Sequence, residues 1–326
     1  MDQTKENGNS AHLTRREMLK TTVAGILATG LIGGGVFGYL NRRSIWAVNN
    51  MLKMGHCAPS VMKTLLDVDG SYDQDIVRLA GPLSGGIGNS GGECGAITAG
   101  VIFLGLMNTE MDKIVSAGRV LMKEFRDRHG FIDCDKKPHG MRSCIEAISS
   151  SPERIAKLRE SNITGISGAH QALLHEFDRH GFHCAKAVFH NLGITDARIL
   201  NACRGFLGGT LLSGMTCSAL TAGIMAIGLK KGRIENSYVR VFRMIRMMGP
   251  DDKWLGDEIN NFNRSMNLGN RLHAWFKNTY GTCKCRKICG CSFDDEAEAR
   301  RYVEKGGVRQ CRSIAASVAH KVRESL

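Results

Sequence analysis

The sequence is poor in proline and in aromatic residues, with 5 prolines and 6% aromatics among 326 residues. It contains no Cys-x-x-Cys-His, the attachment motif of c-type haem, and no Cys-x-x-Cys, the motif of thioredoxin-like enzymes. A Gly-x-Gly-x-x-Gly match at 86–91 follows no strand pattern, so it does not indicate a dinucleotide-binding fold. The apolar runs at 96–106 and 219–229 are too short to cross a membrane. The chain is instead rich in glycine and methionine, with 39 and 15 residues, and this composition favours helices joined by glycine turns. We therefore predict an all-α protein.

An internal repeat organises the chain. Residues 93–106 align without gaps to residues 216–229, with seven identities in fourteen positions. The match extends outward on both sides, so we predict two tandem homologous helical repeats that pack as a pseudo-dimer. The predicted divisions are a signal or N-terminal anchor at 1–43, a first repeat at 44–160, and a second repeat at 161–326 with an insert near 232–270.

Each repeat supplies four cysteines in the same order. They are Cys57, Cys94, Cys134 and Cys144 in the first repeat, and Cys184, Cys217, Cys285 and Cys311 in the second. Together with the glycine-rich loop and the Cys-Gly/Ser-Ala-x-Thr-Ala-Gly helix start, this order resembles the redox-active protein family named for its C-GCAxxG-C-C pattern. The resemblance covers about residues 45–326 and implies a cysteine-bound redox centre such as an iron–sulfur cluster. A more distant resemblance to the split-Soret cytochromes would imply covalent haem, but the chain lacks the attachment motif.

Cys94 and Cys217 are the strongest ligand candidates. Each follows a glycine-rich loop and stands at the expected start of an apolar helix. The free N–H groups and the positive dipole end of a helix start favour thiolate over thiol, so we expect a lowered pKa at both cysteines. His56 and His183 precede the first cysteine of each repeat, but a histidine of this kind is more often structural than a ligand.

Four cysteines have no counterpart in the other repeat. They are Cys203, Cys283, Cys289 and Cys291. The last three join Cys285 in a Cys-x-Cys-x3-Cys-x-Cys run. Such a run could bind an additional metal ion or form a local disulfide beside one cluster ligand, and both interpretations stay open.

The N-terminal segment resembles a twin-arginine export signal. Arg15 and Arg16 stand just before an apolar, glycine-rich run at 21–40. We expect export to the periplasm, with retention in the cytoplasmic membrane by residues 21–40 as the alternative. The route carries folded proteins, which suits a protein loaded with its cofactor in the cytoplasm. Twelve cysteines in an exported chain also fit disulfides, which remain the alternative to a metal centre.

The net charge of +13 suggests a partner of opposite charge. We expect an acidic redox protein or an anionic membrane surface. An exported protein does not meet nucleic acid, so we expect none among its partners, and a homo-oligomer is compatible with the sequence.

Three functional hypotheses follow. The favoured one is an exported electron-transfer protein that binds iron–sulfur clusters through four cysteines per repeat. The second is a thiol–disulfide oxidoreductase with Cys94 or Cys217 as nucleophile. The third is a structural module stabilised by disulfides or zinc.

Overall fold

The computed structural model describes residues 42–161, 163, 165–233 and 264–326. The expected export signal, with Arg15, Arg16 and the run at 21–40, lies outside these residues, as does most of the insert expected near 232–270. The chain divides into a unit of Met1–Arg42 and a compact unit of Arg43–Leu326, to which the following description applies. No helix among the described residues is long and apolar enough to cross a membrane.

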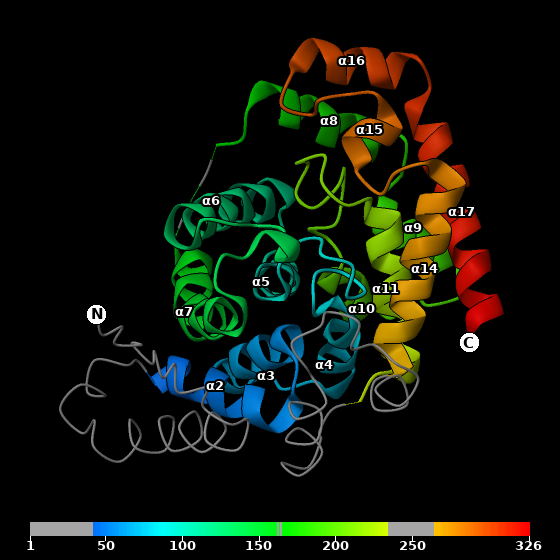
Figure 1. Cartoon of the computed structure of the whole chain (residues 1–326). Helices are drawn as coiled ribbons and strands as arrows, with labels where there is room; N and C mark the ends of the chain where they lie inside the picture. The colour runs from blue at the N-terminus through cyan, green and yellow to red at the C-terminus, as the bar shows by residue number, and fades with distance from the viewer. Residues whose placement is uncertain (1–41, 162, 164, 234–263) are drawn as a thin grey trace, which may run out of the picture. The chain divides into compact units, whose positions relative to one another are not determined.

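The described residues form helices and no strand, which confirms the all-α prediction (Figure 1). The helices before residue 162 are α2 (Arg42–Met54), α3 (Cys57–Asp69), α4 (Gln74–Ala80), α5 (Gly95–Met107), α6 (Met111–His129) and α7 (Gly140–Glu160), with the 3-10 turns η2 (Gly81–Leu83) and η3 (Cys134–Lys136). Those after it are α8 (Gly168–Arg179), α9 (Cys184–Asn191), α10 (Ala197–Ala202), α11 (Ser218–Lys231), α14 (Arg264–Tyr280), α15 (Cys285–Cys289), α16 (Glu296–Glu304) and α17 (Gly307–Ser325).

Helix starts and ends follow local signals in the sequence. The Asp73 side chain accepts hydrogen bonds from the N–H groups of Asp75 and Ile76 and so begins α4. Gly130, with φ of 79°, ends α6 where the sequence predicts a stop. Pro138 and Gly140 predict a loop over residues 131–144, but this prediction is wrong at its end, because α7 already begins at Gly140. The sequence also predicts a helix from Glu153 to Glu160, and these residues form the second part of α7, with Pro152 inside the helix.

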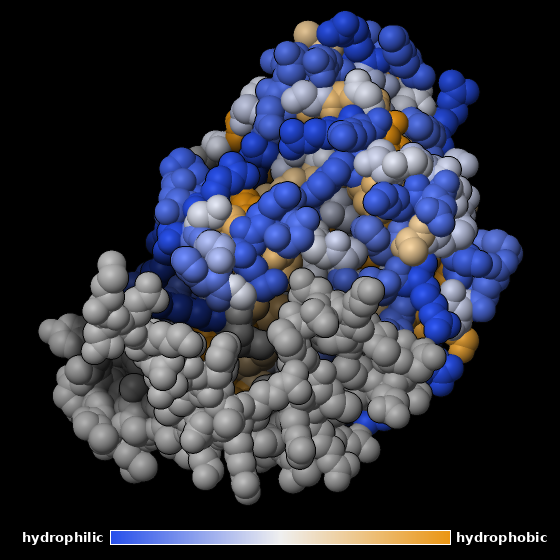
Figure 2. Space-filling model, viewed as in Figure 1, coloured by the Kyte–Doolittle hydropathy of each residue, from blue (hydrophilic) through white to orange (hydrophobic). Residues whose placement is uncertain are grey.

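Each repeat surrounds one mainly apolar, buried helix. Helix α5 packs against α3, α6 and α7, and α11 packs in the same way against α9, α14 and α17 (Figure 1). Buried residues of both helices belong to one continuous hydrophobic core. The large apolar side chains that stay exposed are scattered, and the face in Figure 2 is mainly hydrophilic over α8 and α16.

The two repeats exchange their short third helices, α4 and α10. Helix α10 of the second repeat packs on α5 of the first, and α4 of the first packs on α11 of the second. Close approach depends on matched glycines: a Cβ atom on Gly105 would lie 2.6 Å from the Asn201 carbonyl oxygen, and one on Gly228 would lie 2.6 Å from that of Arg78. The repeat alignment pairs Gly105 with Gly228 and, extended upstream at the same offset, pairs Arg78 with Asn201. The repeats therefore form a pseudo-dimer with a shared core, as predicted.

Both glycine-rich loops form a left-handed turn. Residues 85–89 and the equivalent residues 208–212 all have positive φ. In the second turn the non-glycine residues Thr210, Leu211 and Leu212 adopt this conformation, at about 1–2 kcal/mol each. Leu211 and Leu212 are fully buried, and burial of a leucine contributes about 1.5–3 kcal/mol, which offsets this strain.

Candidate functional site

All eight repeated cysteines lie at or near helix starts. Cys57 and Cys184 are the first residues of α3 and α9, and Cys94 and Cys217 are the N-caps of α5 and α11. The remaining four lie in or near the first turn of η3, α15, α7 and α17: Cys134, Cys285, Cys144 and Cys311. Cys144 thus lies on a helix rather than in the expected loop.

The first four cysteines gather in one place, which we call cluster 1: Cys57, Cys94, Cys134 and Cys144. A Cβ atom on Gly95 would lie 2.5 Å from Cys57 Sγ, so the start of α3 packs directly against the start of α5. The Cys94 N–H donates to the Ile132 carbonyl at 2.8 Å, and the Cys134 N–H donates to the Gly92 carbonyl at 2.7 Å. These two bonds hold the loop of Cys134 beside Cys94.

The second repeat forms the equivalent cluster 2: Cys184, Cys217, Cys285 and Cys311. The Cys217 N–H donates to the Cys283 carbonyl at 2.8 Å, and the Cys285 N–H donates to that of Met215 at 2.6 Å, as in cluster 1. A fifth cysteine joins this cluster, since Cys289 Sγ lies 3.8 Å from Cys285 Sγ. The Tyr302 hydroxyl lies 2.8 Å from Cys311 Sγ. Cluster 2 is therefore chemically different from cluster 1.

The family described as "Putative redox-active protein (C_GCAxxG_C_C)" matches residues 55–158 and 182–325. The chain belongs to this family. The match in two segments confirms the two tandem copies and supports a general redox role. No curated protein and no solved structure matches the chain significantly. The predicted division near residue 160 falls between the two family segments and stays a prediction.

In this family member, burial and crowding control the ionisation of cluster 1. Burial and then the neighbouring Cys57 raise the pKa of Cys94 well above its ordinary value. The same two causes raise the pKa of Cys134 to about 11 and, with Cys134 added, that of Cys144 to about 12. The Ala96 N–H does bond to Cys94 and lowers its pKa, as expected for a helix start, but burial outweighs it. Without a bound metal, the protein therefore favours the thiol form of Cys94 and not the expected thiolate.

Cluster 2 follows the same rule with one exception. Burial and then Cys285 raise the pKa of Cys217, so the expectation for that residue also fails. Cys184 and Cys289 both hydrogen-bond to Cys311, and these bonds lower the pKa of Cys311. Cys311 is thus the first thiol of cluster 2 to ionise. The sequence did not identify Cys289 as a member of cluster 2. The one signal for it was its position in the dense run of cysteines after Cys283.

The surplus cysteines have different surroundings, although Cys289 and Cys291 belong to the same buried cluster. Cys283 Sγ lies 3.9 Å from the His273 carbonyl oxygen, whereas Cys289 lies in cluster 2. Cys291 is buried in a smaller core cluster with Phe293 and Tyr302. Cys203 is fully buried, with its Sγ 3.2 Å from the Leu200 carbonyl oxygen. An added metal site at Cys283, Cys289 and Cys291 stays a prediction.

Within the part of the chain that the structure describes, no group of three or more His, Cys, Asp or Glu side chains converges on a position for a metal ion. All twelve cysteines lie in that part and are free thiols. Their donor chemistry nevertheless fits an iron–sulfur cluster, because each repeat offers four cysteine sulfurs, the usual complement of [2Fe–2S] and [4Fe–4S] centres.

The two histidines before the clusters have structural surroundings. His183 caps α9 by accepting from the Lys186 N–H, and its Nε2 lies 2.9 Å from the Arg204 carbonyl oxygen. Burial lowers the pKa of both His56 and His183 to about 4, so both rings are neutral at physiological pH. Both ring nitrogens of His183 are engaged by the backbone, which agrees with the interpretation of this residue as structural.

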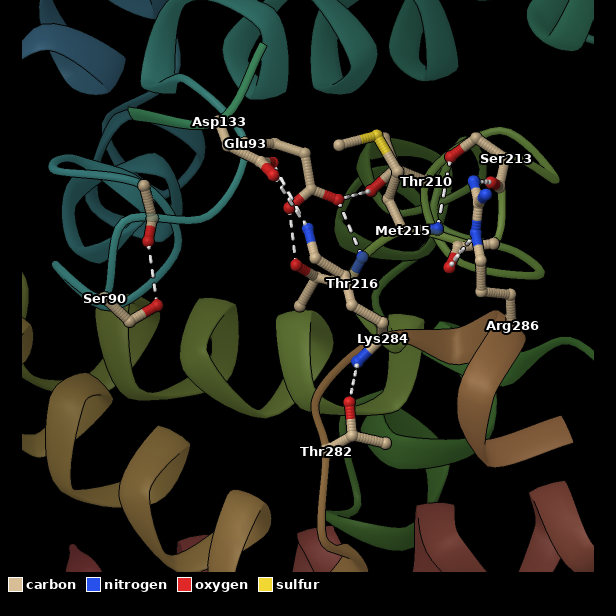
Figure 3. A network of polar contacts seen from close by, with 12 residues as sticks. Ser90, Glu93, Asp133, Thr210, Ser213, Met215, Thr216, Thr282, Lys284 and Arg286 are labelled. Carbon is tan, nitrogen blue, oxygen red and sulfur yellow. Dashed lines mark hydrogen bonds and ion pairs between the residues drawn. The ribbon is translucent and has the colours of Figure 1, made fainter. Parts of the chain in front are cut away.

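A polar seam joins the two clusters (Figure 3). Glu93, directly before Cys94, is fully buried and accepts hydrogen bonds from the Thr216 N–H at 2.8 Å, the Thr216 hydroxyl and the Thr210 hydroxyl. Thr216 directly precedes Cys217 and is the repeat equivalent of Glu93. Likewise Lys284 Nζ lies 3.1 Å from Asp133 Oδ2, again between equivalent positions. The pseudo-twofold axis therefore passes through this seam, with a cluster on each side.

Proposed function

We propose that the protein is an exported redox protein that binds an iron–sulfur cluster in each cysteine cluster and transfers electrons. The observation that carries the proposal is the gathering of four cysteines at helix starts, twice, in equivalent positions. Cysteine sulfur is the ligand of iron–sulfur clusters, and a bound cluster would supply one-electron chemistry.

The surroundings of the cysteines support this assignment. Backbone N–H groups reach the sulfurs: that of Ala96 bonds to Cys94, that of Gly208 bonds to Cys184, and those of Ala219 and Leu220 bond to Cys217. Hydrogen bonds to the sulfurs tune the reduction potential of iron–sulfur centres. Burial of the sulfurs also limits the access of water. The protein thus offers donors, a hydrogen-bonded shell and a low-dielectric setting.

The first test is the iron and acid-labile sulfide content of residues 45–326, purified without oxygen, together with the visible spectrum. We expect iron with equimolar sulfide and an absorbance that bleaches on reduction. Cys94→Ala and Cys217→Ala should each remove about half of the iron, because each repeat holds its own centre. Cys203→Ala is the matched control, a buried cysteine outside both clusters that should retain all of it. A protein that stays iron-free and colourless after attempted reconstitution would refute the proposal.

A second candidate is thiol–disulfide exchange at cluster 2. The observation that favours it is the contact of Cys289 with both Cys285 and Cys311, whose lowered pKa supplies a thiolate. For this candidate we propose Cys311 as the nucleophile in place of Cys94 or Cys217, because burial raises the pKa of both of those thiols. Disulfide reduction by iron-free protein, abolished by Cys311→Ser, would favour this candidate. Stoichiometric zinc without sulfide would instead indicate a structural module.

Export and partners are part of the proposal. The pair Arg15–Arg16 before the apolar run at 21–40 supports the twin-arginine route, and the charge of +13 supports an acidic redox partner or an anionic membrane surface. Replacing both arginines by lysine should leave the protein in the cytoplasm. Fractionation of the periplasm and the membrane then distinguishes a released protein from one anchored by residues 21–40.

A further inference from the structure

A pocket of about 810 Å³ opens in the second repeat, bordered by α8, α9 and α17. Its apolar wall includes Phe177, Phe182 and Leu207, which belong to the same buried cluster as Cys184. Its polar lining includes Lys186, Asn191 and Arg312. A volume of about 300–1,000 Å³ is typical of sites for small molecules.

The pocket lies directly beside cluster 2. His183 and Leu207 both line it, and His183 immediately precedes Cys184. The residue after Leu207 is Gly208, whose N–H bonds to Cys184. A molecule in the pocket would therefore contact the chain neighbours of Cys184 and of Gly208.

The charges of the lining favour an anion. Lys186 and Arg312 both line the pocket. Among the described residues, no ion pair engages Lys186 or Arg312. The Arg312 guanidinium lies 5.2 Å from the centre of the Phe182 ring and donates to the His180 carbonyl, and neither contact neutralises its charge. Asp178 is the carboxylate that the described residues contribute to the lining, so two cations face one anion.

The first repeat lacks these two cations. Counting from the first cysteine of each repeat, Lys186 corresponds to Pro59, and counting from the last, Arg312 corresponds to Ile145. The charge pattern is therefore particular to the second repeat and does not follow from the repeat itself.

We propose that this pocket binds a small organic anion, a molecule with an apolar ring body and one acidic group. The ring would lie on the wall of Phe177, Phe182 and Leu207, and the acidic group would pair with Lys186 and Arg312. A role of this molecule as redox partner of cluster 2 rests on the proposed function, whereas its binding does not.

The test compares two fluorescent probes with the same ring body, using the full chain as isolated and again after removal of any bound metal. Anilinonaphthalene sulfonate carries the acidic group, and N-phenyl-1-naphthylamine lacks it. We expect one sulfonate per chain, bound at least tenfold more tightly than the neutral probe, because an ion pair in a partly buried site is screened little. Lys186→Ala should weaken the sulfonate about tenfold and leave the neutral probe unchanged, while Lys186→Arg should retain binding.

Lys123→Ala is the matched control. Lys123 is exposed on α6 and pairs with Asp127, so its removal changes the net charge equally but leaves the pocket intact. Equal affinity of the two probes, many sulfonates per chain, or the same loss in both alanine variants would overturn the proposal. Sulfonate binding that persists in an iron-free protein would support the anion-binding proposal even if the protein holds no iron–sulfur cluster. Failure of the anion-binding proposal can therefore be distinguished from failure of the proposed function.

Discussion

Replacement of Glu93 tests whether the polar seam holds the two repeats together. In Glu93→Ala, the buried Thr216 N–H and the Thr210 hydroxyl lose their acceptor. A buried donor left without a partner costs about 1–3 kcal/mol, and the cavity adds to this. We therefore expect the free energy of unfolding to fall by about 3–5 kcal/mol.

Glu93→Gln separates the hydrogen bonds from the charge. The amide oxygen still accepts from the Thr216 N–H, but the bonds are no longer charge-assisted. A bond to a charged group contributes about 1.5–3 kcal/mol against about 0.5–1.5 for a neutral one, so we expect a loss of about 1–2 kcal/mol. Thr216→Val removes one hydroxyl donor and keeps the N–H, and should cost about 1 kcal/mol.

The assay is denaturant unfolding of the reduced, metal-free chain, followed by circular dichroism. An unchanged slope with a lower midpoint identifies a loss of stability. In thermal unfolding the alanine variant should melt about 6–10 °C lower, at about 2 °C per kcal/mol for a unit of this size. Glu110→Ala is the control, because Glu110 is exposed and pairs with Lys113 one turn further along the same segment. The reasoning is refuted if Glu93→Ala lies within 0.5 kcal/mol of the parent, or if glutamine costs as much as alanine.

Two further predictions concern glycines. Gly105→Ala and Gly228→Ala should each lower the free energy of unfolding by about 1–3 kcal/mol, and by similar amounts. The reason is that each new Cβ would lie 2.6 Å from a carbonyl oxygen of the other repeat. Clearly unequal denaturation midpoints of the two variants would contradict the exchange of equivalent helices. Gly86→Ala and Gly209→Ala would place a Cβ 2.8 Å from that of Cys134 and 2.7 Å from that of Cys285. Each should therefore lower the iron content by about half, and full iron in both would argue against clusters at these cysteines.

Much of the fold follows from local signals in the sequence. The repeat, the helices after Cys94 and Cys217, and the stop at Gly130 are visible because they depend on neighbouring residues. The small residues Ala96 and Gly100, and likewise Ala219 and Gly223, predict close helix packing. A Cβ on Gly100 would indeed lie 2.6 Å from the Leu121 side chain, and one on Gly223 would lie 2.5 Å from that of Val318.

Other features depend on contacts between distant segments and could not be predicted. The left-handed turn at 208–212 places Thr210 and two leucines at positive φ, and burial in the shared core, not local preference, stabilises it. The exchange of α4 and α10 leaves no periodic pattern, because either helix could cover either repeat. The high pKa of Cys94 likewise arises from the burial and crowding that bring four thiols together.

The order of the cysteines predicted the two groups of four but not the difference between them. Cys289 joins cluster 2 through its contact with Cys285, and nothing in the spacing identifies it over Cys283 or Cys291. Glu93 was visible only as a mismatch with Thr216 in the repeat alignment. Their complementary hydrogen bonds depend on the axis that brings equivalent positions together.

Because the repeats exchange their short helices, the first repeat cannot finish folding during synthesis until part of the second repeat has been made. The ribosome must add about 95 residues after the end of α5 before α10 can cover it, which takes roughly 5–20 s at about 5–20 residues per second. Until then part of an apolar helix stays uncovered, and the nascent chain needs protection from aggregation. Once closed, neither repeat can open alone without exposing the central helix of the other, so damage to one should unfold both, and proteolytic separation of the halves should yield no stable fragment.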